Sequence, residues 1–393
     1  MDPDVLVVGA GPAGAIAALV LARAGVGVRL IDRATFPRDK LCGDSLNPGA
    51  MALLARHGLA EAVEARGLPV EGMWLTGPGG IGVAGTYPRG LLGRSLARSD
   101  LDVMLVSAAE RAGAAIELGV RVTGPLTDGD ARRPRVTGVA IASPSGRLIE
   151  RRARVVIAAD GRRSTLAVAL GLTHSPRSPR RWALGAYYEG VDDLMRRGEM
   201  HVRSGRYLGV APVPNGLANV CLVVPEARAR AAMRAPSVAI EAALTADPAL
   251  RERFRRARRV SEVRALGPLA VDADAAGMPG LLLAGDAAGF VDPITGDGMR
   301  IAMRGAELAA TAAHRGLEGM AEAHGELALE RAREFSTKLR VNRALRAVVT
   351  RPATVVGASA MAKVAPAIFE QLIAYAGDVG LTSSSPLVSA AAT

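Results

Sequence analysis

Short, uninterrupted apolar runs recur at wide intervals along the chain, and each predicts a buried strand. They occupy Val5–Val8, Gly27–Ile31, Val155–Ala159 and Leu281–Ala284. A strand of a parallel sheet is covered on both faces, so it is apolar throughout instead of alternating with polar residues. The four runs therefore indicate one parallel sheet that is assembled from distant parts of the chain.

Alternating patterns between these runs predict antiparallel sheet with one face toward water. Residues 182–225 alternate in this way and are rich in Tyr and Val. From Glu71 onward the chain predicts a hairpin, in which Pro78-Gly79-Gly80 joins two strands. Shorter strands are expected near Ile116–Leu118, Arg121–Thr123, Val136–Ala142 and Leu148–Arg152.

Periodic apolar segments bounded by glycine and proline predict the helices. They are expected at Ala15–Ala24, Gly49–His57, Leu101–Ala112, Ser237–Thr245, Ala249–Ala257 and Gly298–Arg315, and over most of the residues from there to Gly377. The apolar stretch Pro352–Gly377 is expected to pack in the core, and the alternatives are a cover over a pocket or a peripheral contact with a membrane surface.

The order of these elements predicts a discontinuous nucleotide-binding domain. Its parts would be residues 1–70, 96–170 and 266–335, interrupted by a sheet domain for the substrate made of residues 71–95 and 171–265. Residues 336–381 would form a helical C-terminal region, and residues 382–393 a loose tail.

The composition is that of a globular protein with a large core. The chain has 393 residues, of which 49% are hydrophobic, enough for two domains or for one with a large insertion. Its two cysteines, Cys42 and Cys221, are too few and too far apart for a disulfide framework or a zinc site. The first strand begins at Val5, which leaves no room for a signal peptide, and no uncharged apolar run has the length of a membrane span. We therefore expect a cytoplasmic protein.

The net charge of +11 does not by itself indicate a nucleic-acid partner. Only three of the 49 basic residues are lysine, and Ala, Gly and Arg are abundant, as in proteins encoded by GC-rich genomes. Aromatic residues make up 3% of the chain, too few for platforms on which bases stack, so no nucleic acid is expected. We interpret the dense cluster Arg251–Arg259 as a solvated helix face, with an anionic partner or a membrane surface as the alternative.

The segment after the first strand has the pattern of a dinucleotide site. Gly9, Gly11 and Gly14 follow the spacing G-x-G-x-x-G between the predicted strand and helix. The first glycine allows a tight turn, the second lets the backbone approach a pyrophosphate, and the third lets the helix pack on the strand. The helix N-terminus offers free N–H groups to the phosphates. Asp32 follows the second strand, where a carboxylate can accept a hydrogen bond from a ribose hydroxyl.

Two further motifs extend this pattern over nearly the whole chain. Residues 155–167 read VVIAADGRRSTLA, and residues 281–303 read LLLAGDAAGFVDPITGDGMRIAM. With the glycine pattern, they resemble the superfamily of geranylgeranyl reductase-like proteins and flavoprotein monooxygenases. The resemblance implies an α/β fold: a glutathione-reductase-type, Rossmann-like FAD domain with an inserted antiparallel-sheet substrate domain and a helical C-terminal region. Ala167 stands where the family often has an arginine, so any contact made by that arginine is absent.

The resemblance also assigns roles to residues of the cofactor site. It implies that Asp160 lies near the FAD pyrophosphate, Asp286 on the ribityl chain, and the loop Pro293–Gly298 against the isoalloxazine. A glycine-rich loop that opens a helix directs N–H groups at the edge of the flavin where charge gathers on reduction. The predicted FAD-binding residues are Gly9, Gly11, Ala13, Gly14, Asp32, Arg33, Cys42, Gly43, Arg98, Val122, Asp160, Asp286, Pro293, Gly296, Gly298 and Met299.

Two segments narrow the choice within the superfamily. FPRDKLCGDSLNPGA, which starts at Phe36, resembles the segment of geranylgeranyl reductase-like proteins whose cysteine lies beside the flavin, and its GDSLNP half is similar to a segment of flavin halogenases. Cys42 is thus the candidate catalytic residue, with a thiol pKa lowered by Arg38 and Lys40; the alternative is a small apolar pocket wall. YLGVAPVPNGLANV is similar to a Y-x-W-x-F-P segment of the reductases, but Gly209 stands where the tryptophan would be.

These features leave three functions open. The first is an FAD-dependent reductase of a C=C bond in a lipophilic or prenylated molecule. The second is an FAD-dependent monooxygenase acting on an aromatic or natural-product substrate, with halogenation a weaker variant because no W-x-W-x-I-P segment is present. The third is a non-catalytic flavin- or nucleic-acid-binding protein. The five histidines show neither a triad nor a metal pattern, so catalysis would depend on the cofactor, with NADPH or NADH as a transient electron donor.

Overall fold

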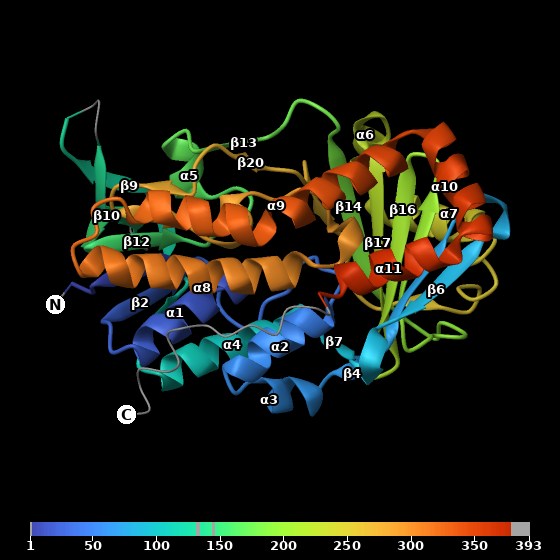
Figure 1. Ribbon diagram of the computed structural model, residues 1–393, viewed down its shortest axis with the longest axis horizontal. Coiled ribbons are helices and arrows are strands. Elements are labelled where there is room, and N and C mark those ends of the chain that lie inside the picture. The colour runs from blue at the N-terminus through green and yellow to red at the C-terminus, as the bar shows by residue number, and fades with distance from the viewer. Residues whose placement is uncertain (1, 131–133, 144–145, 379–393) are drawn as a thin grey trace.

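The computed structural model describes residues 2–130, 134–143 and 146–378, and the tail expected at 382–393 lies outside these ranges. A largely parallel sheet forms the left half of the molecule in Figure 1. Its strands lie in the order β21 (Gly277–Met278), β22 (Leu281–Leu283), β12 (Val155–Ala158), β1 (Val5–Val8), β2 (Val28–Asp32) and β8 (Ala115–Leu118). The pairs from β22 to β8 are parallel, and the edge strand β21 is antiparallel. The four apolar runs form β1, β2, β12 and β22, so this prediction is confirmed.

Alternate residues of these strands face opposite layers. Val5 and Val7 belong to a core shared with helices, whereas Leu6 and Val8 belong to a core on the other face. The helical layer contains α1 (Pro12–Arg23), α2 (Pro48–Arg56), α3 (Ala60–Glu64), α4 (Arg98–Arg111) and α8 (Gly298–Leu317). The opposite layer contains β9 (Arg121–Asp128), β10 (Arg135–Ala142), β11 (Leu148–Arg152) and α5 (Thr165–Ala169). Both faces of the sheet are therefore covered, as its apolar strands require.

An eight-stranded sheet forms the right half of the molecule in Figure 1. Its strands lie in the order β18 (Arg258–Arg259), β14 (Arg181–Glu189), β17 (Leu217–Pro225), β16 (Arg206–Val213), β15 (Gly198–Arg203), β5 (Gly72–Thr76) and β6 (Gly82–Thr86), with β19 (Arg264–Leu266) also paired to β14. The hairpin predicted after Glu71 is β5–β6. Helices α6 (Glu226–Arg234) and α7 (Pro236–Ala246) pack against one face.

The remaining elements join and cover the two sheets. Helix α9 (Ala323–Thr350) packs along α8, and α10 (Pro352–Val364) and α11 (Pro366–Ala376) follow it onto the second sheet. The smaller elements are β3 (Ser45–Leu46), β4 (Leu68–Val70), β7 (Gly93–Ser95), β13 (Thr173–His174), β20 (Asp272–Ala273), and the 3₁₀ turns η1 (Pro78–Gly80), η2 (Pro88–Gly90), η3 (Gly285–Ala288) and η4 (Pro293–Thr295). The predicted fold class is confirmed, while the limits of the domains stay a prediction.

The helix predicted at Ala249–Ala257 is wrong, because this segment is a series of turns. Arg253 donates to the buried carboxylate of Glu199 at 2.7 and 2.8 Å, and Phe254 packs edge-on against Tyr188 at 5.6 Å between ring centroids. These contacts with the second sheet override the helical propensity of the segment. The arginine cluster is thus not one solvated helix face.

Candidate functional site

The three sequence motifs meet at the carboxyl ends of β1, β12 and β22. A Cβ atom at Gly9 would lie 2.6 Å from the Asp160 Cα, and one at Gly285 would lie 2.8 Å from the Ala13 Cβ. A Cβ atom at Gly14 would overlap the carbonyl oxygen of Gly9, so α1 packs directly on the turn before it. Ligands of open α/β sheets bind at this end of the strands, which makes the junction the candidate site.

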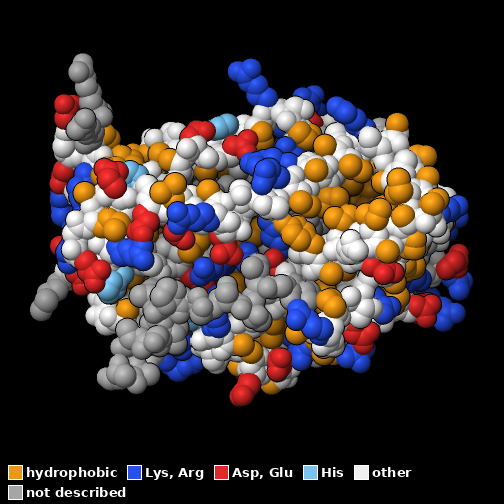
Figure 2. Space-filling model, in the orientation of Figure 1, with side chains coloured by type: hydrophobic (Ala, Val, Ile, Leu, Met, Phe, Trp, Pro, Cys, Tyr) orange, Lys and Arg blue, Asp and Glu red, His pale blue; other side chains and the backbone are white. Residues whose placement is uncertain are grey.

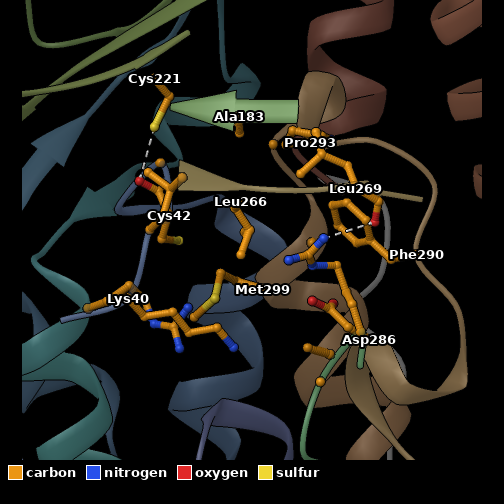
Figure 3. A pocket seen from close by; sticks show the side chains of 18 of the residues that line it. Lys40, Cys42, Ala183, Cys221, Leu266, Leu269, Asp286, Phe290, Pro293 and Met299 are labelled. Carbon is orange, nitrogen blue, oxygen red and sulfur yellow. Dashed lines mark hydrogen bonds between the residues drawn. The ribbon is translucent and has the colours of Figure 1, made fainter. Parts of the chain in front are cut away.

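A cavity of about 240 Å³ opens where these motifs face the second sheet. The predicted site residues that line it are Gly11, Ala13, Cys42, Gly43, Arg98, Asp286, Pro293, Gly296, Gly298 and Met299. Figure 3 shows Lys40 and Cys42 on one side of the cavity, Asp286 and Phe290 on the other, and Met299 between them. The structure therefore brings residues from all three motifs and from the Cys42 segment into one place.

The other predicted residues do not line this cavity; they are Gly9, Gly14, Asp32, Arg33, Val122 and Asp160. Asp160 accepts the backbone N–H of Thr165 at 2.8 Å and so caps α5. Arg33 is exposed, and Val122 is buried in β9. Their assignment to a cofactor stays a prediction.

Two helix N-termini open on the cavity. Helix α1 begins after Gly11 and α8 begins after Asp297, and neither N-cap side chain accepts a hydrogen bond from its helix. Gly11, Ala13, Gly298 and Met299 at these ends line the cavity. A helix N-terminus carries unpaired N–H donors and a partial positive charge, so each end favours a negatively charged group.

Buried charges surround the same end of the cavity. Arg98 donates to both carboxylate oxygens of Asp102 at 2.9 to 3.0 Å, and Arg38 lies 3.3 Å from Asp102. Burial lowers the pKa of Lys40, and the nearby Arg98 acts in the same direction, whereas Asp286 raises it. The cations at this end of the cavity are thus held against carboxylates, with Arg38 also 3.9 Å from Asp32.

The opposite wall is apolar and comes from the second sheet. It is formed by Ala183, Met200, Tyr207, Val223, Leu266 and Leu269. Gly209 lines the cavity among them, and a Cβ atom there would meet no other atom closer than 3.9 Å. The missing side chain leaves room for an apolar group beside β16.

Cys42 faces the cavity, but the lowered thiol pKa expected from its sequence neighbours is wrong. Burial raises the pKa of the Cys42 thiol, although Arg98 acts in the opposite direction. Arg38 is paired with Asp102 instead. The Cys42 carbonyl oxygen accepts a hydrogen bond from the Cys221 thiol at 3.4 Å, the dashed line at the upper left of Figure 3. The Cys42 thiol therefore keeps its proton at neutral pH.

Asp44, which lies in the GDSLNP segment but was not among the predicted site residues, is a buried carboxylate beside Cys42. Its Oδ2 accepts hydrogen bonds from the Tyr187 hydroxyl at 2.6 Å and the Asn219 amide at 2.5 Å, and its Oδ1 accepts the backbone N–H of Arg98 at 3.2 Å. Burial raises the pKa of Asp44 to about 6, and the hydrogen bonds from Tyr187 and Asn219 oppose the shift. The carboxylate thus fixes the Cys42 segment against β14 and β17.

A second cavity, of about 290 Å³, lies on the other side of this segment. Tyr187 and Asn219 line it, and it shares Lys40, Leu41 and Cys42 with the first cavity. The Cys42 segment is therefore a thin partition between two cavities.

Asp292 is a second buried carboxylate that sequence reasoning missed. Its Oδ1 accepts the Tyr207 hydroxyl at 2.5 Å, and its Oδ2 accepts from Arg181 at 3.4 Å. The Asn342 amide donates to the Asp292 carbonyl at 2.9 Å. Because Asp292 precedes Pro293, these bonds fix the loop that lines the cavity.

Asp44 predicts a pH dependence of stability. Its pKa is raised from 3.8 to about 6 in the folded chain, so the folded state binds this proton more tightly than the unfolded state. The free energy of unfolding should then fall as the pH rises from about 4 to about 6, by roughly 3 kcal/mol for two pKa units. Asp44→Asn should lack this slope. Urea unfolding of both proteins at several pH values measures it, and parallel curves would contradict the shift.

The buried histidines serve the fold and not the cavity. His57 lies 2.8 Å from Glu307, and His201 lies 2.9 Å from Glu199. In the part of the chain that the structure describes, no group of three or more His, Cys, Asp and Glu side chains is arranged to hold a metal ion.

A family model and several known proteins match this chain. A family model described as FAD binding domain matches residues 2–342. Menaquinone reductase of Mycolicibacterium smegmatis is 33% identical over 340 residues, which cover 78% of this chain and 75% of that protein. Digeranylgeranylglycerophospholipid reductase 2 of Methanopyrus kandleri is 31% identical over 334 residues, covering 81% and 78%. A solved flavin-dependent brominase superposes with a TM-score of 0.82 at 20% identity, over 96% of this chain and 94% of that one, and thus shares the fold.

Proposed function

The chain belongs to the FAD binding domain family, and on this basis we propose that it reduces a carbon–carbon double bond in a lipophilic, prenylated molecule. That it is an FAD-dependent oxidoreductase follows from the family. The substrate class rests on the apolar wall of the cavity, which faces the two helix N-termini. The names of the two relatives, which are a menaquinone reductase and a reductase of a digeranylgeranyl lipid, support a lipophilic substrate.

The residues around the cavity fit FAD. Gly11 and Ala13 at the start of α1 would hold the pyrophosphate, and Gly298 and Met299 at the start of α8 would hold the pyrimidine edge of the flavin. Asp32 accepts the backbone N–H of Ala10 at 2.7 Å, and each carboxylate oxygen has lone pairs left for a ribose hydroxyl. A dinucleotide needs close backbone approach at this turn, and the glycines supply it.

Reduced FAD would supply a hydride to one carbon of the double bond. The second carbon then needs a proton, and the thiols of Cys42 and Cys221 and the hydroxyl of Tyr207 all hold protons at the cavity wall. We assign Cys42 Sγ–H as the proton donor, because the Tyr207 hydroxyl already donates to Asp292 and the Cys221 thiol to the Cys42 carbonyl, while burial keeps the Cys42 thiol protonated.

The electron donor in this proposal is NADPH or NADH. The G-x-G-x-x-G spacing at Gly9–Gly14 opens a helix and would be occupied by the FAD, whereas the same spacing at Gly77–Gly82 joins the strands β5 and β6. The nicotinamide would therefore bind transiently at the cavity and leave before the lipid enters.

The test is an anaerobic half-reaction. Enzyme reduced by dithionite is mixed with menaquinone or with a geranylgeranyl lipid in detergent, and the flavin absorbance is followed by stopped flow. We expect reoxidation without oxygen and a product whose prenyl chain has gained two hydrogen atoms for each reduced bond. With menaquinone, the mass is measured after air oxidation of the ring, so that a quinol is not counted. A substrate that turns over only with oxygen, and gains an oxygen or a halogen atom, would instead establish a monooxygenase or halogenase.

Gly209 offers a variant matched to this test. Gly209→Glu places a charged side chain in the apolar space beside β16, so it should slow reoxidation by the lipid while FAD content and reduction by NADPH stay unchanged. Gly209→Ala, whose Cβ has no neighbour closer than 3.9 Å, is the control and should behave like the wild type. Equal rates in both variants would contradict a substrate position on this wall.

A further inference from the structure

Helices α10 and α11 expose a broad apolar surface. Val356, Met361, Val364, Ile368 and Tyr375 are 59%, 51%, 84%, 50% and 39% exposed. Figure 2 shows a wide hydrophobic area where these helices lie. Large apolar side chains scattered singly are common on protein surfaces, but a contiguous group on two successive helices indicates an interaction site.

The helices are apolar on two sides, and only one side packs within the described chain. Val355, Ala362 and Ile373 are 2%, 7% and 3% exposed and face the protein. In α10, residues 356, 360 and 364 follow the spacing i, i+4, i+8, so they form one outward stripe along the helix. Core packing, the expectation from sequence, therefore accounts for one face of this region and leaves the other unexplained.

Neither helix of the pair is long enough by itself to cross a bilayer. Among the described residues, no single helix is long and apolar enough to span a membrane, while Ala353–Val364 and Pro366–Ala376 pass a hydropathy test together but meet at 107°. A helix of 13 residues is about 20 Å long, against about 30 Å for the hydrocarbon layer. Such a pair can lie in the interface of one leaflet.

Charges at the edge of this surface are complementary to anionic lipid headgroups. Between Pro352 and Ala376 the charged residues are Lys363 and Glu370, and Arg351 stands at the N-cap of α10. Arg351, Lys363 and Glu370 are all exposed, so these three residues give the surface one net positive charge. A basic side chain near an anionic bilayer surface contributes roughly 1 kcal/mol to binding.

Helices α10 and α11 pack on the sheet that forms the apolar wall of the substrate cavity. Helix α10 packs on β15, whose Met200 lines the cavity, and Met73 and Leu75 of β5 contact both the cavity wall and the core under α11. Docking through α10–α11 would thus bring the sheet that forms the apolar wall of the cavity next to the bilayer.

We propose that the α10–α11 surface docks the enzyme on an anionic lipid bilayer. The bilayer supplies the apolar medium that the outward stripe lacks, and its headgroups pair with Arg351 and Lys363. The role in substrate delivery rests on the proposed function, whereas the docking itself does not.

Sedimentation with vesicles tests the docking. Wild-type holoenzyme should pellet with vesicles of phosphatidylcholine and phosphatidylglycerol, which contain no prenylated lipid. Val356→Asp and Val364→Asp should each weaken binding by about tenfold, from the lost burial of one valine. Val238→Asp is the matched control, because Val238 is 65% exposed on α7 against the opposite face of the second sheet. FAD content and melting temperature show that each variant is folded.

Three results would overturn the proposal. One is wild-type protein that stays in the supernatant at all lipid concentrations. Another is equal vesicle binding by Val364→Asp and Val238→Asp. The third is a dimer in analytical ultracentrifugation that Val364→Asp dissociates, because the surface would then belong to a second copy of the chain. Lys363→Glu should weaken binding to anionic vesicles and leave binding to neutral ones unchanged. None of these results depends on reductase activity, so a failed lipid-reduction assay leaves the docking result intact.

Discussion

Replacing Gly11 with valine is expected to abolish FAD retention and to leave the stability of the apoprotein unchanged. Gly11 has φ −74° and ψ −176°, an extended conformation that valine adopts easily. The nearest atom to a Cβ there is a terminal nitrogen of Arg38 at 3.5 Å, an ordinary contact. The new methyl groups would occupy the place where the pyrophosphate must approach. Losing about two charge-assisted hydrogen bonds at roughly 1.5–3 kcal/mol each corresponds to about 10²–10⁴-fold weaker binding.

Gly14→Ala is the contrasting variant. Its Cβ would overlap the Gly9 carbonyl oxygen, so it should lower both the melting temperature of the apoprotein and the affinity for FAD. Isothermal titration with FAD and thermal unfolding of the apoproteins measure the two quantities separately. A Gly11→Val protein that binds FAD like the wild type would place the pyrophosphate elsewhere.

Replacing Cys42 with alanine should slow reoxidation of the reduced enzyme by substrate by about 10²–10⁴-fold, the range for loss of a general acid. Reduction by NADPH should be unchanged, because hydride delivery to the flavin needs no thiol. Reoxidation of Cys42→Ser, which retains an exchangeable proton, should be slower than in the wild type and faster than in Cys42→Ala. Single-turnover stopped flow separates the half-reactions.

Cys221→Ala is the control for this pair, because Cys221 lines the same cavity and donates to the Cys42 carbonyl at 3.4 Å. It should leave both half-reactions nearly unchanged. If Cys42→Ala is equally harmless, the thiol only fills space and the proton comes from another group or from water.

The sequence predicted the parallel strands, the glycine turn and most helices because their signals are local. Gly9, Gly11 and Gly14 stand within six residues of one another, and a buried strand is visible as four apolar residues in a row. The arrangement of the two sheets followed from the resemblance, which covers nearly the whole chain. The segment Ala249–Ala257 shows the limit, since its helical pattern yielded to contacts of Arg253 and Phe254 with distant residues.

The buried carboxylates of the site could not be predicted from the sequence, because the residues that bind them are distant in the chain. The Asp44 carboxylate accepts hydrogen bonds from Tyr187 and Asn219, which lie 143 and 175 positions away, and no pattern near Asp44 in the sequence predicts these partners. The same cause misled the assignment of the Cys42 pKa: Arg38 is close in sequence, but in the fold it is paired with Asp102. Burial then has the largest effect on the pKa of the Cys42 thiol, and it raises this pKa, whereas a nearby cation lowers it.

The hydrogen bonds that Asp44 accepts limit which parts of related enzymes can be exchanged in a chimera. The Cys42 segment precedes the second sheet in the chain, yet Tyr187 and Asn219 of that sheet hold it in place. A chimera that exchanges the second sheet for that of a relative would leave a buried carboxylate without partners unless both residues came with it. We therefore expect a chimera with its junction between the two sheets to fold only when both parents have the aspartate, the tyrosine and the asparagine.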